Sequence, residues 1–406
     1  MALVVQKYGG SSVADADKIR NVARRIAAVK DKGNDVVVTV SAMGNTTDEL
    51  IGLAYQLNEQ PDGRELDALL STGEVVSSTL LTMALEAMGY EAISLTGGQA
   101  GIRTDATYRR ARILKVESKR VVKELEKGNI VIVAGFQGIT EDMNVTTLGR
   151  GASDTTAVAL AASLEAEVCE IYTDVEGVYT ADPRIVPEAR PLAEIGYEEM
   201  LELASHGTKV MHSRAVEIGE LHHIPILVAS SFTGKPGTLI HGGVSMEVRN
   251  KVRGIAHDLD VAKVTVVGVP DRPGIAAAIF EPLAAASISV DTIVQNASID
   301  NITDLTFTVS RGQLDEVMEV ISPIAKEIGA RECVSDSTQG KVSIVGTGML
   351  NMPGFAARMF SALSEKGINI QLITTSEIRI TCIVDEGRVK DAVRVLHQAF
   401  ELDVGD

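Results

Sequence analysis

The sequence predicts an α/β protein in which a mostly parallel sheet, sandwiched by helices, is followed by two ferredoxin-like βαββαβ modules. Short β-branched runs alternate with helical stretches as far as about residue 240, which is typical of a parallel sheet with helices on both faces. The second half contains an internal repeat of a smaller unit. A chain of 406 residues is also too long for one ordinary core, so we expect two or three domains.

The large sheet belongs to the first part of the chain, where apolar runs and polar turns mark its elements. The predicted strands cover 2–7, 35–41, 91–95, 129–135, 170–173 and 224–229. The predicted helices cover 14–30, 72–88, 109–127 and 155–164. In such sheets the loops at the carboxyl ends of the strands carry the chemistry.

The repeat predicts the two smaller modules. KVTVVG at 263–268 matches KVSIVG at 341–346, and a Pro-Gly pair follows each copy. Each copy reads strand, turn, helix, strand, strand, helix, which fits the ferredoxin-like plan. A segment rich in glycine and proline at 232–253 separates the repeat from the large sheet. We therefore expect three domains, at 1–245, 246–335 and 336–406.

Composition and charge narrow the classes of function. No apolar run approaches the roughly 18 uncharged residues of a membrane helix, and the N-terminus lacks a signal peptide pattern, which predicts a cytoplasmic protein without a membrane partner. The net charge of −17 argues against binding to nucleic acid, which needs an electropositive face. The three cysteines are expected to be buried free thiols. No HxxxH or CxxC spacing builds a metal site, so any metal must arrive with a ligand.

The turn KYGGSSV at 7–13 joins the first strand to the first helix. Gly9 and Gly10 let backbone N–H groups approach an anion, the helix N-terminus adds a partial positive charge, and Lys7 adds a full one. An ordinary turn explains a glycine pair alone, but the lysine, glycines and hydroxyls together favour phosphate binding. The pattern GxxxxGK[ST] is absent, so this is not a Walker nucleotide loop.

A second segment, RGASD, stands before a predicted helix and contains Arg150, Ser153 and Asp154. Either Ser153 or Asp154 would serve as an N-cap, which is the ordinary explanation for such residues. A cap needs no guanidinium, whereas the planar fork of Arg150 suits a carboxylate. We therefore favour an anion-binding role for this segment.

For the other polar segments, spacing alone does not decide between a functional and a purely structural role. Ser41 ends a predicted strand and Thr47 follows it, and both fit an ordinary polar turn. Glu74, in STGE, begins a predicted helix, where the helix dipole would stabilise a glutamate without any function. The polar loop 172–184 either wraps a nucleotide or connects elements at the surface. Lys209 is either a solvated lysine or a second phosphate ligand.

Taken in order, the motifs KYGGSSV, SAMG, STGE, RGASDTTA, YTDVEGVYTADPR and GTKV resemble those of the aspartate kinases of the amino-acid kinase superfamily, in its monofunctional form. The repeat is similar to the paired regulatory ACT modules of that family. The resemblance covers essentially the full chain. It implies ATP-dependent phosphorylation of the L-aspartate side chain to 4-phospho-L-aspartate, at the start of lysine, threonine, methionine and diaminopimelate biosynthesis.

The resemblance also implies roles for single residues. Lys7 and Asp154 would be catalytic. The substrate would contact Thr47, Glu74, Arg150 and Ser153. The nucleotide would contact Lys7, Gly9, Gly10, Ser41, Thr173, Asp174, Tyr179, Asp182, Arg184 and Lys209. ATP would bring Mg²⁺ with it.

The resemblance further implies feedback inhibition by threonine, lysine or both, through tighter effector binding to an inactive arrangement. The effector would lie between modules and contact Asp271, Asp291, Gln295, Asn369 and Ile370. A homo-oligomer through the ACT modules is expected. Met246, just past the last glycine of the segment 232–253, could also start a separate regulatory chain.

The sequence departs from the family pattern at two positions. Ala152 stands where the family usually has a second glycine, and only glycine is indifferent to positive φ. The effect of Ala152 on the backbone is therefore an open question. Glu176 stands where the family usually has aspartate and keeps the charge.

Two alternatives compete with this interpretation. A kinase of the same fold could act on glutamate, acetylglutamate or carbamate. Arg150 with Glu74 favours a free α-amino acid as substrate, which disfavours acetylglutamate and carbamate. Aspartate and glutamate differ by one methylene, and the sequence distinguishes only weakly between them. The chain could instead be an amino-acid sensor that has lost catalysis. Loss of Lys7 or Arg150 would mark such a sensor, and both are present.

Overall fold

The computed structural model describes residues 2–149, 151–208, 210–243, 252–296, 301–350 and 352–404. It forms two compact units. The first contains Met1–Tyr179 and Pro191–Val248, and the second contains Thr180–Arg190 and Arg249–Asp406. Arg150, Lys209 and Met246, three residues singled out by the sequence, lie outside the described residues.

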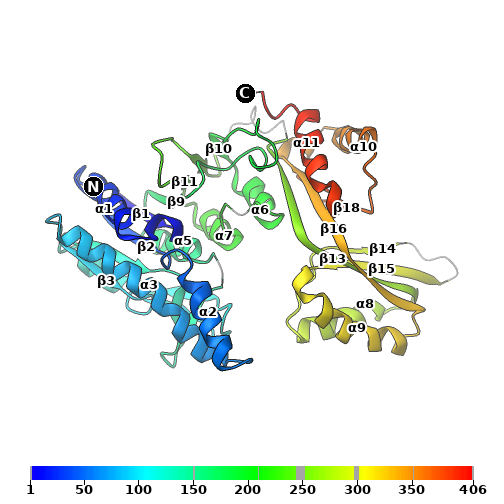
Figure 1. Ribbon diagram of the computed structural model, residues 1–406, viewed down its shortest axis with the longest axis horizontal. Helices are drawn as coiled ribbons and strands as arrows, with labels where there is room; N and C mark the ends of the chain where they lie inside the picture. The colour runs from blue at the N-terminus through cyan, green and yellow to red at the C-terminus, as the bar shows by residue number, and fades with distance from the viewer. Residues whose placement is uncertain are drawn as a thin grey trace. The chain divides into compact units, whose positions relative to one another are not determined.

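The first unit is built on an eight-stranded sheet (Figure 1). Its strands, in spatial order, are β10 (Glu194–Ile195), β12 (Thr238–Ile240), β11 (Ile226–Ser230), β9 (Val168–Thr173), β1 (Leu3–Tyr8), β2 (Asp35–Val40), β6 (Ile130–Ala134) and β3 (Ala92–Leu95). From β11 to β3 all neighbours are parallel, and β12 is antiparallel to β11. The predicted mostly parallel sheet is confirmed, and the carboxyl ends of its central strands meet at one edge.

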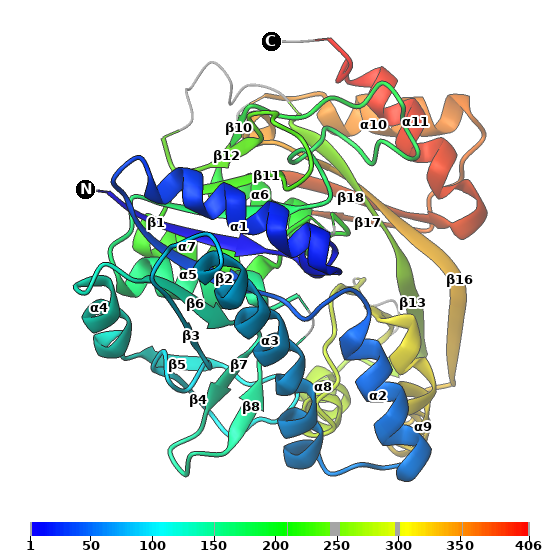
Figure 2. The same ribbon diagram turned by 60° about the vertical axis from the view of Figure 1, so that its left-hand side comes forward.

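Helices cover both faces of this sheet. Apolar residues of α1 (Ala16–Lys30) and α3 (Gly63–Glu86) form one core with β1, β2 and β6, and α1 lies beside β1 in both views (Figures 1 and 2). The alternate strand residues Val37, Val131 and Val133 are buried on the opposite face. There α5 (Ser153–Ser163) packs against β1 and β2, and α7 (Ser213–His222) packs against α5.

The remaining elements of the first unit surround this arrangement. They are η1 (Gly10–Val13), α2 (Thr46–Leu57), α4 (Lys119–Leu125) and α6 (Tyr197–Ser205). A separate four-stranded sheet has the order β5 (Ile113–Val116), β4 (Ile102–Thr104), β7 (Gln137–Ile139) and β8 (Val145–Thr147). Among the described helices, α3 alone is long and apolar enough to cross a membrane, but half of its most apolar stretch is buried, as in a core helix.

Two predicted helices were wrong in their bounds. The helix predicted at 72–88 begins at Gly63, because Asp62 accepts hydrogen bonds from the N–H groups of Arg64 and Glu65 and caps it there. The helix predicted at 109–127 is helical only over α4. The β-branched residues around Ile113 form β5 instead, paired with β4.

The second unit contains one six-stranded antiparallel sheet. Its order is β14 (Ile293–Gln295), β15 (Ile302–Val309), β13 (Gly254–Pro270), β16 (Glu332–Val345), β18 (Arg379–Asp385) and β17 (Leu372–Thr375). One core forms around α8 (Ile275–Ala285) and α9 (Leu314–Glu327), and another around α10 (Phe355–Glu365) and α11 (Val389–Ala399). Each helix pair lies side by side in both views (Figures 1 and 2).

The two modules of this unit share their central strands. The second part of β13 pairs with β15 in the first module, while Gly254–Asp258 at its start pairs with β16 beside the second core. The final strand of the second module therefore precedes the first module in the chain. The predicted ferredoxin-like modules are confirmed, but the first is inserted into the second.

The second core also includes a segment from far upstream. Ala181, Ile185 and Val186 are buried in it, although they lie between β9 and β10 of the first unit. The chain leaves the first unit after Tyr179 and returns at Pro191, and these two residues pair in an antiparallel bridge. The segment 179–191 is called the crossing hairpin below.

Candidate active site

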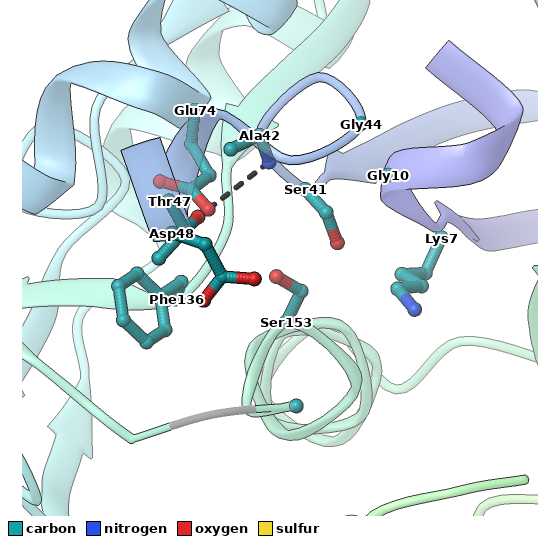
Figure 3. Close-up of a pocket in the computed structure, with 11 residues that line it drawn as sticks. Lys7, Gly10, Ser41, Ala42, Gly44, Thr47, Asp48, Glu74, Phe136 and Ser153 are labelled. Carbon is teal, nitrogen blue, oxygen red and sulfur yellow. Dashed lines mark hydrogen bonds between the residues drawn. The ribbon is translucent and has the colours of Figure 1, made fainter. Parts of the chain in front are cut away.

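A cavity of about 220 Å³ lies at the carboxyl ends of β1 and β2. It is lined by residues from five separate parts of the first unit: Lys7, Gly10, Ser41, Ala42, Gly44, Thr47, Asp48, Glu74, Phe136, Gly151 and Ser153. The side chains of Lys7, Ser41 and Ser153 converge on one space (Figure 3). The strand-end turns that the sequence singled out are therefore brought together.

Lys7, at the end of β1, provides the positive charge of this cavity. Its Nζ lies 2.6 Å from Oδ1 of Asp154, and both side chains are about nine-tenths buried. The other oxygen of Asp154 accepts a hydrogen bond from the backbone N–H of His212, at the N-terminus of α7. Asp154 thus holds the Lys7 ammonium in place inside the site, because a buried charge without a partner would be strongly destabilising.

The glycine turn brings the backbone close to this ammonium. A Cβ on Gly9 would lie 3.6 Å from the Lys7 Nζ, and one on Gly10 would lie 2.8 Å from the Ala42 carbonyl, so a side chain at Gly10 would clash. Within this turn, Gly10–Val13 form a single 3₁₀ turn, η1. The helix predicted at 14–30 begins two residues later, at Ala16, with Asp15 as its cap. The turn therefore offers backbone N–H groups rather than a full helix dipole.

Glu74 occupies the opposite side of the cavity. One carboxylate oxygen accepts a hydrogen bond of 3.0 Å from the N–H of Ala42, and the other has no hydrogen-bond partner among the described residues. Burial raises the pKa of Glu74 to about 8. Because α3 begins at Gly63, Glu74 lies in the middle of the helix, and first-turn stabilisation by the dipole is excluded. A buried carboxylate with an unused oxygen is suited to binding a cation.

Ser153 and Asp154 do not cap α5. The N-cap position is occupied by Ala152, whose side chain cannot accept a hydrogen bond. Ser153 instead lines the cavity. The φ of Ala152 is −79°, a value that any residue adopts, while the neighbouring Gly151 has a φ of +77°. Alanine is therefore compatible with the backbone at this position, since the conformation that needs glycine falls on Gly151.

The polar loop 172–184, which contains further residues predicted to bind the nucleotide, begins at the end of β9. The hydroxyl of Thr173 donates to Asp174, and the carbonyl of Thr173 accepts from the N–H of Ser231. The Ser231 hydroxyl lies 2.7 Å from that of Ser12 in the glycine turn. The start of the predicted nucleotide loop is therefore tied to the phosphate turn. The hydroxyl of Tyr179 donates to Glu176, which also pairs with Lys235.

Asp182 and Arg184 have a different position from the other predicted nucleotide residues. They pair with each other and lie in the crossing hairpin, which packs with the second unit. Their role in nucleotide binding stays a prediction. The roles of Arg150 and Lys209 also stay predictions, because both residues lie outside the described parts of the chain.

The predicted effector residues lie in the second unit. Asp271 donates its N–H to the carbonyl of Asn301, and the carboxylate of Asp291 pairs with Lys341 of β16. Burial lowers the pKa of Lys341 to about 8. The other predicted residues are Gln295 at the end of β14, and Asn369 and Ile370 in the loop after α10. Their common role in effector binding stays a prediction.

The sequence did not single out several residues that the structure places in or beside these sites. Asp48, in the first turn of α2, lines the cavity, and its position directly after Thr47 was a usable signal. Phe136 also lines it, with a positive φ of 67°, for which the sequence gives no sign. Lys341 resembled an ordinary strand residue. In the described parts of the chain, no three His, Cys, Asp or Glu side chains gather as a metal site requires.

The comparisons with known proteins agree with this geometry. Residues 2–230 match the amino acid kinase family, and residues 263–325 and 342–400 each match an ACT domain. These matches define an amino acid kinase domain followed by two ACT domains. The aspartate kinase of Stutzerimonas stutzeri is 51% identical, over 99% of this chain and 98% of that protein. The chain therefore belongs to the aspartokinase family and is a kinase.

Solved structures show the same fold. E. coli aspartokinase III in complex with aspartate and ADP has a TM-score of 0.84 at 24% identity, covering 98% of this chain and 100% of that one. The same E. coli enzyme with lysine and aspartate has a TM-score of 0.74 at 25% identity, covering 98% and 99%. The predicted fold class is thus confirmed from the sequence relatives, the family matches and the structures.

Proposed function

We propose that the chain catalyses transfer of the γ-phosphoryl group of ATP to the side-chain carboxylate of L-aspartate, forming 4-phospho-L-aspartate. The observation that carries this proposal is the pairing, in one cavity, of a buried carboxylate with an unused oxygen and a buried lysine. The Glu74 carboxylate suits the α-ammonium of an amino acid. Lys7 suits a phosphoryl group in transfer.

Phosphoryl transfer to a carboxylate requires few groups beyond a buried lysine and a site that binds the substrate. A carboxylate is already nucleophilic at neutral pH, so no general base is needed, and catalysis consists of alignment and charge neutralisation. Lys7 would neutralise the phosphoryl oxygens, with Asp154 orienting its ammonium. Gly9, Gly10 and Ser41 would contact phosphate oxygens. Mg²⁺ would arrive with ATP, keep several waters and neutralise part of the phosphate charge.

The substrate would lie between these phosphate groups and Glu74. Thr47 and Ser153 line the same cavity, and Arg150 would bind the α-carboxylate. Further contacts to the nucleotide would come from Thr173, Asp174, Tyr179, Asp182, Arg184 and Lys209. Acetylglutamate and carbamate lack a free α-ammonium, so a site with Glu74 disfavours both.

We also propose a regulatory role for the two ACT modules. Lysine, threonine or both would inhibit by binding an inactive arrangement more tightly, near Asp271, Asp291, Gln295, Asn369 and Ile370. A solved relative contains lysine together with aspartate, which supports this class of effector. We expect a cytoplasmic homo-oligomer that supplies lysine, threonine, methionine and diaminopimelate synthesis. A separate regulatory chain starting at Met246 would be visible as a second polypeptide in the native host.

A coupled ATP assay tests the central claim. Aspartate, glutamate and acetylglutamate are offered in turn, each with and without added lysine and threonine. We expect turnover with aspartate, little with the other two, and inhibition by at least one effector. Absence of aspartate-dependent turnover would overturn the proposed function and favour the sensor alternative.

A further inference from the structure

We propose that Arg214 is a positioning residue that holds one wall of the substrate cavity in place. The proposal rests on the function proposed above, because its kinetic effect is expected on aspartate binding. Arg214 lies in the first turn of α7 and does not line the cavity. Its guanidinium donates to two backbone carbonyls, that of Leu148 at 2.8 Å and that of Ala111 at 3.0 Å.

The two carbonyls belong to separate loops that meet behind the cavity. Leu148 and Ala111 are both buried, at 1% and 0% exposure, so water is not a ready partner for their carbonyls. The side chains of both residues share a small core with Phe136 and Ala152. A planar guanidinium bridges two fixed acceptors in a way that a flexible ammonium cannot.

Leu148 connects this bridge to the cavity. Its N–H donates to the carbonyl of Phe136 at 2.9 Å, and Phe136 lines the cavity. On the other side, Gly149 accepts a hydrogen bond from Ala152, directly before the cavity residue Ser153. Movement of Leu148 would therefore shift the part of the wall that includes Phe136, Gly151 and Ser153.

A second support acts on the same segment from α3. Asp67 is fully buried and accepts hydrogen bonds from the N–H and the hydroxyl of Thr147, at 2.8 and 2.7 Å. Asp67 thus holds the residue before Leu148, while Arg214 holds Leu148 itself. Among the described residues no carboxylate forms an ion pair with Arg214, and burial lowers the pKa of this guanidinium. Its desolvation is offset by hydrogen bonds to the two carbonyls and by the charges of Glu217 and Asp105. Direct bonds to two backbone carbonyls are the arrangement expected of a structural clamp.

The chain offers a matched control in Arg25. This arginine of α1 also donates to two backbone carbonyls, those of Ser230 and Thr233, each at 3.0 Å. It is partly buried in the same unit but holds the segment after β11, on the side of the predicted nucleotide loop. Arg25→Lys removes the same kind of clamp from a different wall.

The test compares Arg214→Lys and Arg214→Ala with Arg25→Lys in the full-length protein. For Arg214→Lys we expect the KM for aspartate to rise about tenfold, equivalent to roughly 1.4 kcal/mol or one hydrogen bond from a charged donor. The values of kcat and of the KM for ATP should stay within about twofold. Arg25→Lys should leave the KM for aspartate within about twofold of the wild type.

Hydrogen exchange of a peptide spanning 145–149 gives a readout that does not depend on the substrate. We expect faster exchange there in Arg214→Lys and no change in Arg25→Lys. Unchanged exchange, an unchanged KM for aspartate, or parallel loss of all kinetic constants with a lower Tm would overturn the positioning role. If Arg214→Ala does not fold, Arg214→Lys decides. If the wild type does not phosphorylate aspartate, the proposed function fails, and the exchange result alone decides whether Arg214 clamps this wall.

Discussion

Glu74 and Lys7 show how the two charges of the site are held in different ways. Lys7 has a close partner in Asp154, whose Oδ1 lies 2.6 Å from the Lys7 Nζ. Glu74 has one backbone N–H and no opposite charge among its hydrogen-bond partners, so burial favours its neutral form and raises its pKa to about 8. Among the described residues, the cavity thus has a paired positive charge at one end and a carboxyl oxygen without a hydrogen-bond partner at the other. A substrate ammonium would complete the second end.

Glu74→Gln should make the free protein more stable at alkaline pH. The pKa of Glu74 rises from its usual 4.5 to about 8 on folding, so the folded chain binds an extra proton between these values. The free energy of unfolding therefore falls as pH rises from 4.5 to about 8. An amide resembles the protonated acid, so we expect wild type and variant to have similar stability near pH 5, and the variant to be more stable near pH 8.5. Urea unfolding at both pH values measures this, and a less stable variant at pH 8.5 would contradict it.

Lys7→Ala should act on the transition state. We expect kcat at saturating aspartate to fall about 10²–10³-fold, comparable to removal of one electrostatic contact at a developing charge. The KM for aspartate should change little, because Lys7 lies at the phosphate end of the cavity. Steady-state kinetics with both substrates varied provides the measurement. Glu74→Gln serves as the contrast, with its main effect on the KM for aspartate, and a near-normal kcat in Lys7→Ala would remove this lysine from the reaction.

At the scale of elements, the sequence predicted the strands well because their β-branched runs are buried on both faces. The strand-end turns with Lys7, Ser41 and Ser153 were also found, since parallel strands bring their carboxyl ends to one edge. The start of α3 was missed because Asp62 caps it within a polar stretch that resembles a loop. This error mattered for function, since it left a dipole explanation for Glu74 that the true helix start excludes.

The crossing hairpin was not predictable from local pattern. Its loop-like sequence fits a surface connection, and nothing in its spacing indicates that Ile185 and Val186 are buried in the second core. Its polar contacts are also with residues far away in the sequence. The Thr180 hydroxyl lies 3.0 Å from Nε2 of His397, and Arg394 donates to the carbonyl of Ile185. The conformation of the crossing hairpin is therefore determined by packing within the whole second unit rather than by the local sequence of the hairpin.

Ile185→Ala should therefore destabilise the second unit. Removal of a buried isoleucine side chain typically costs about 2–5 kcal/mol, and the packing of Ile185 against α11 places it in that range. Leu114→Ala is the control, since Leu114 is 69% exposed, and we expect it to change stability by less than about 0.5 kcal/mol. Urea unfolding of the full-length proteins measures both. Equal stability of the two variants would show that the hairpin does not contribute to this core.

At the scale of the whole molecule, the two units are not consecutive pieces of chain. The first unit is interrupted by the crossing hairpin, which carries Asp182 and Arg184 and belongs to the second unit. The second module is likewise interrupted by the first. Two residues predicted to bind the nucleotide, Asp182 and Arg184, therefore belong to the same compact unit as the ACT domains.

This interleaving predicts that a chain ending at residue 243 will not behave as an independent kinase. Without the second unit, Ala181, Ile185 and Val186 lose their core, and the hairpin that carries Asp182 and Arg184 loses its support. We expect the 1–243 chain to be aggregation-prone and to have kcat/KM for ATP reduced at least about tenfold. Co-expression with a 244–406 chain should restore solubility and turnover. Sedimentation and the coupled assay measure both, and a monodisperse 1–243 chain with full turnover and no response to lysine or threonine would show that the hairpin does not support the nucleotide site.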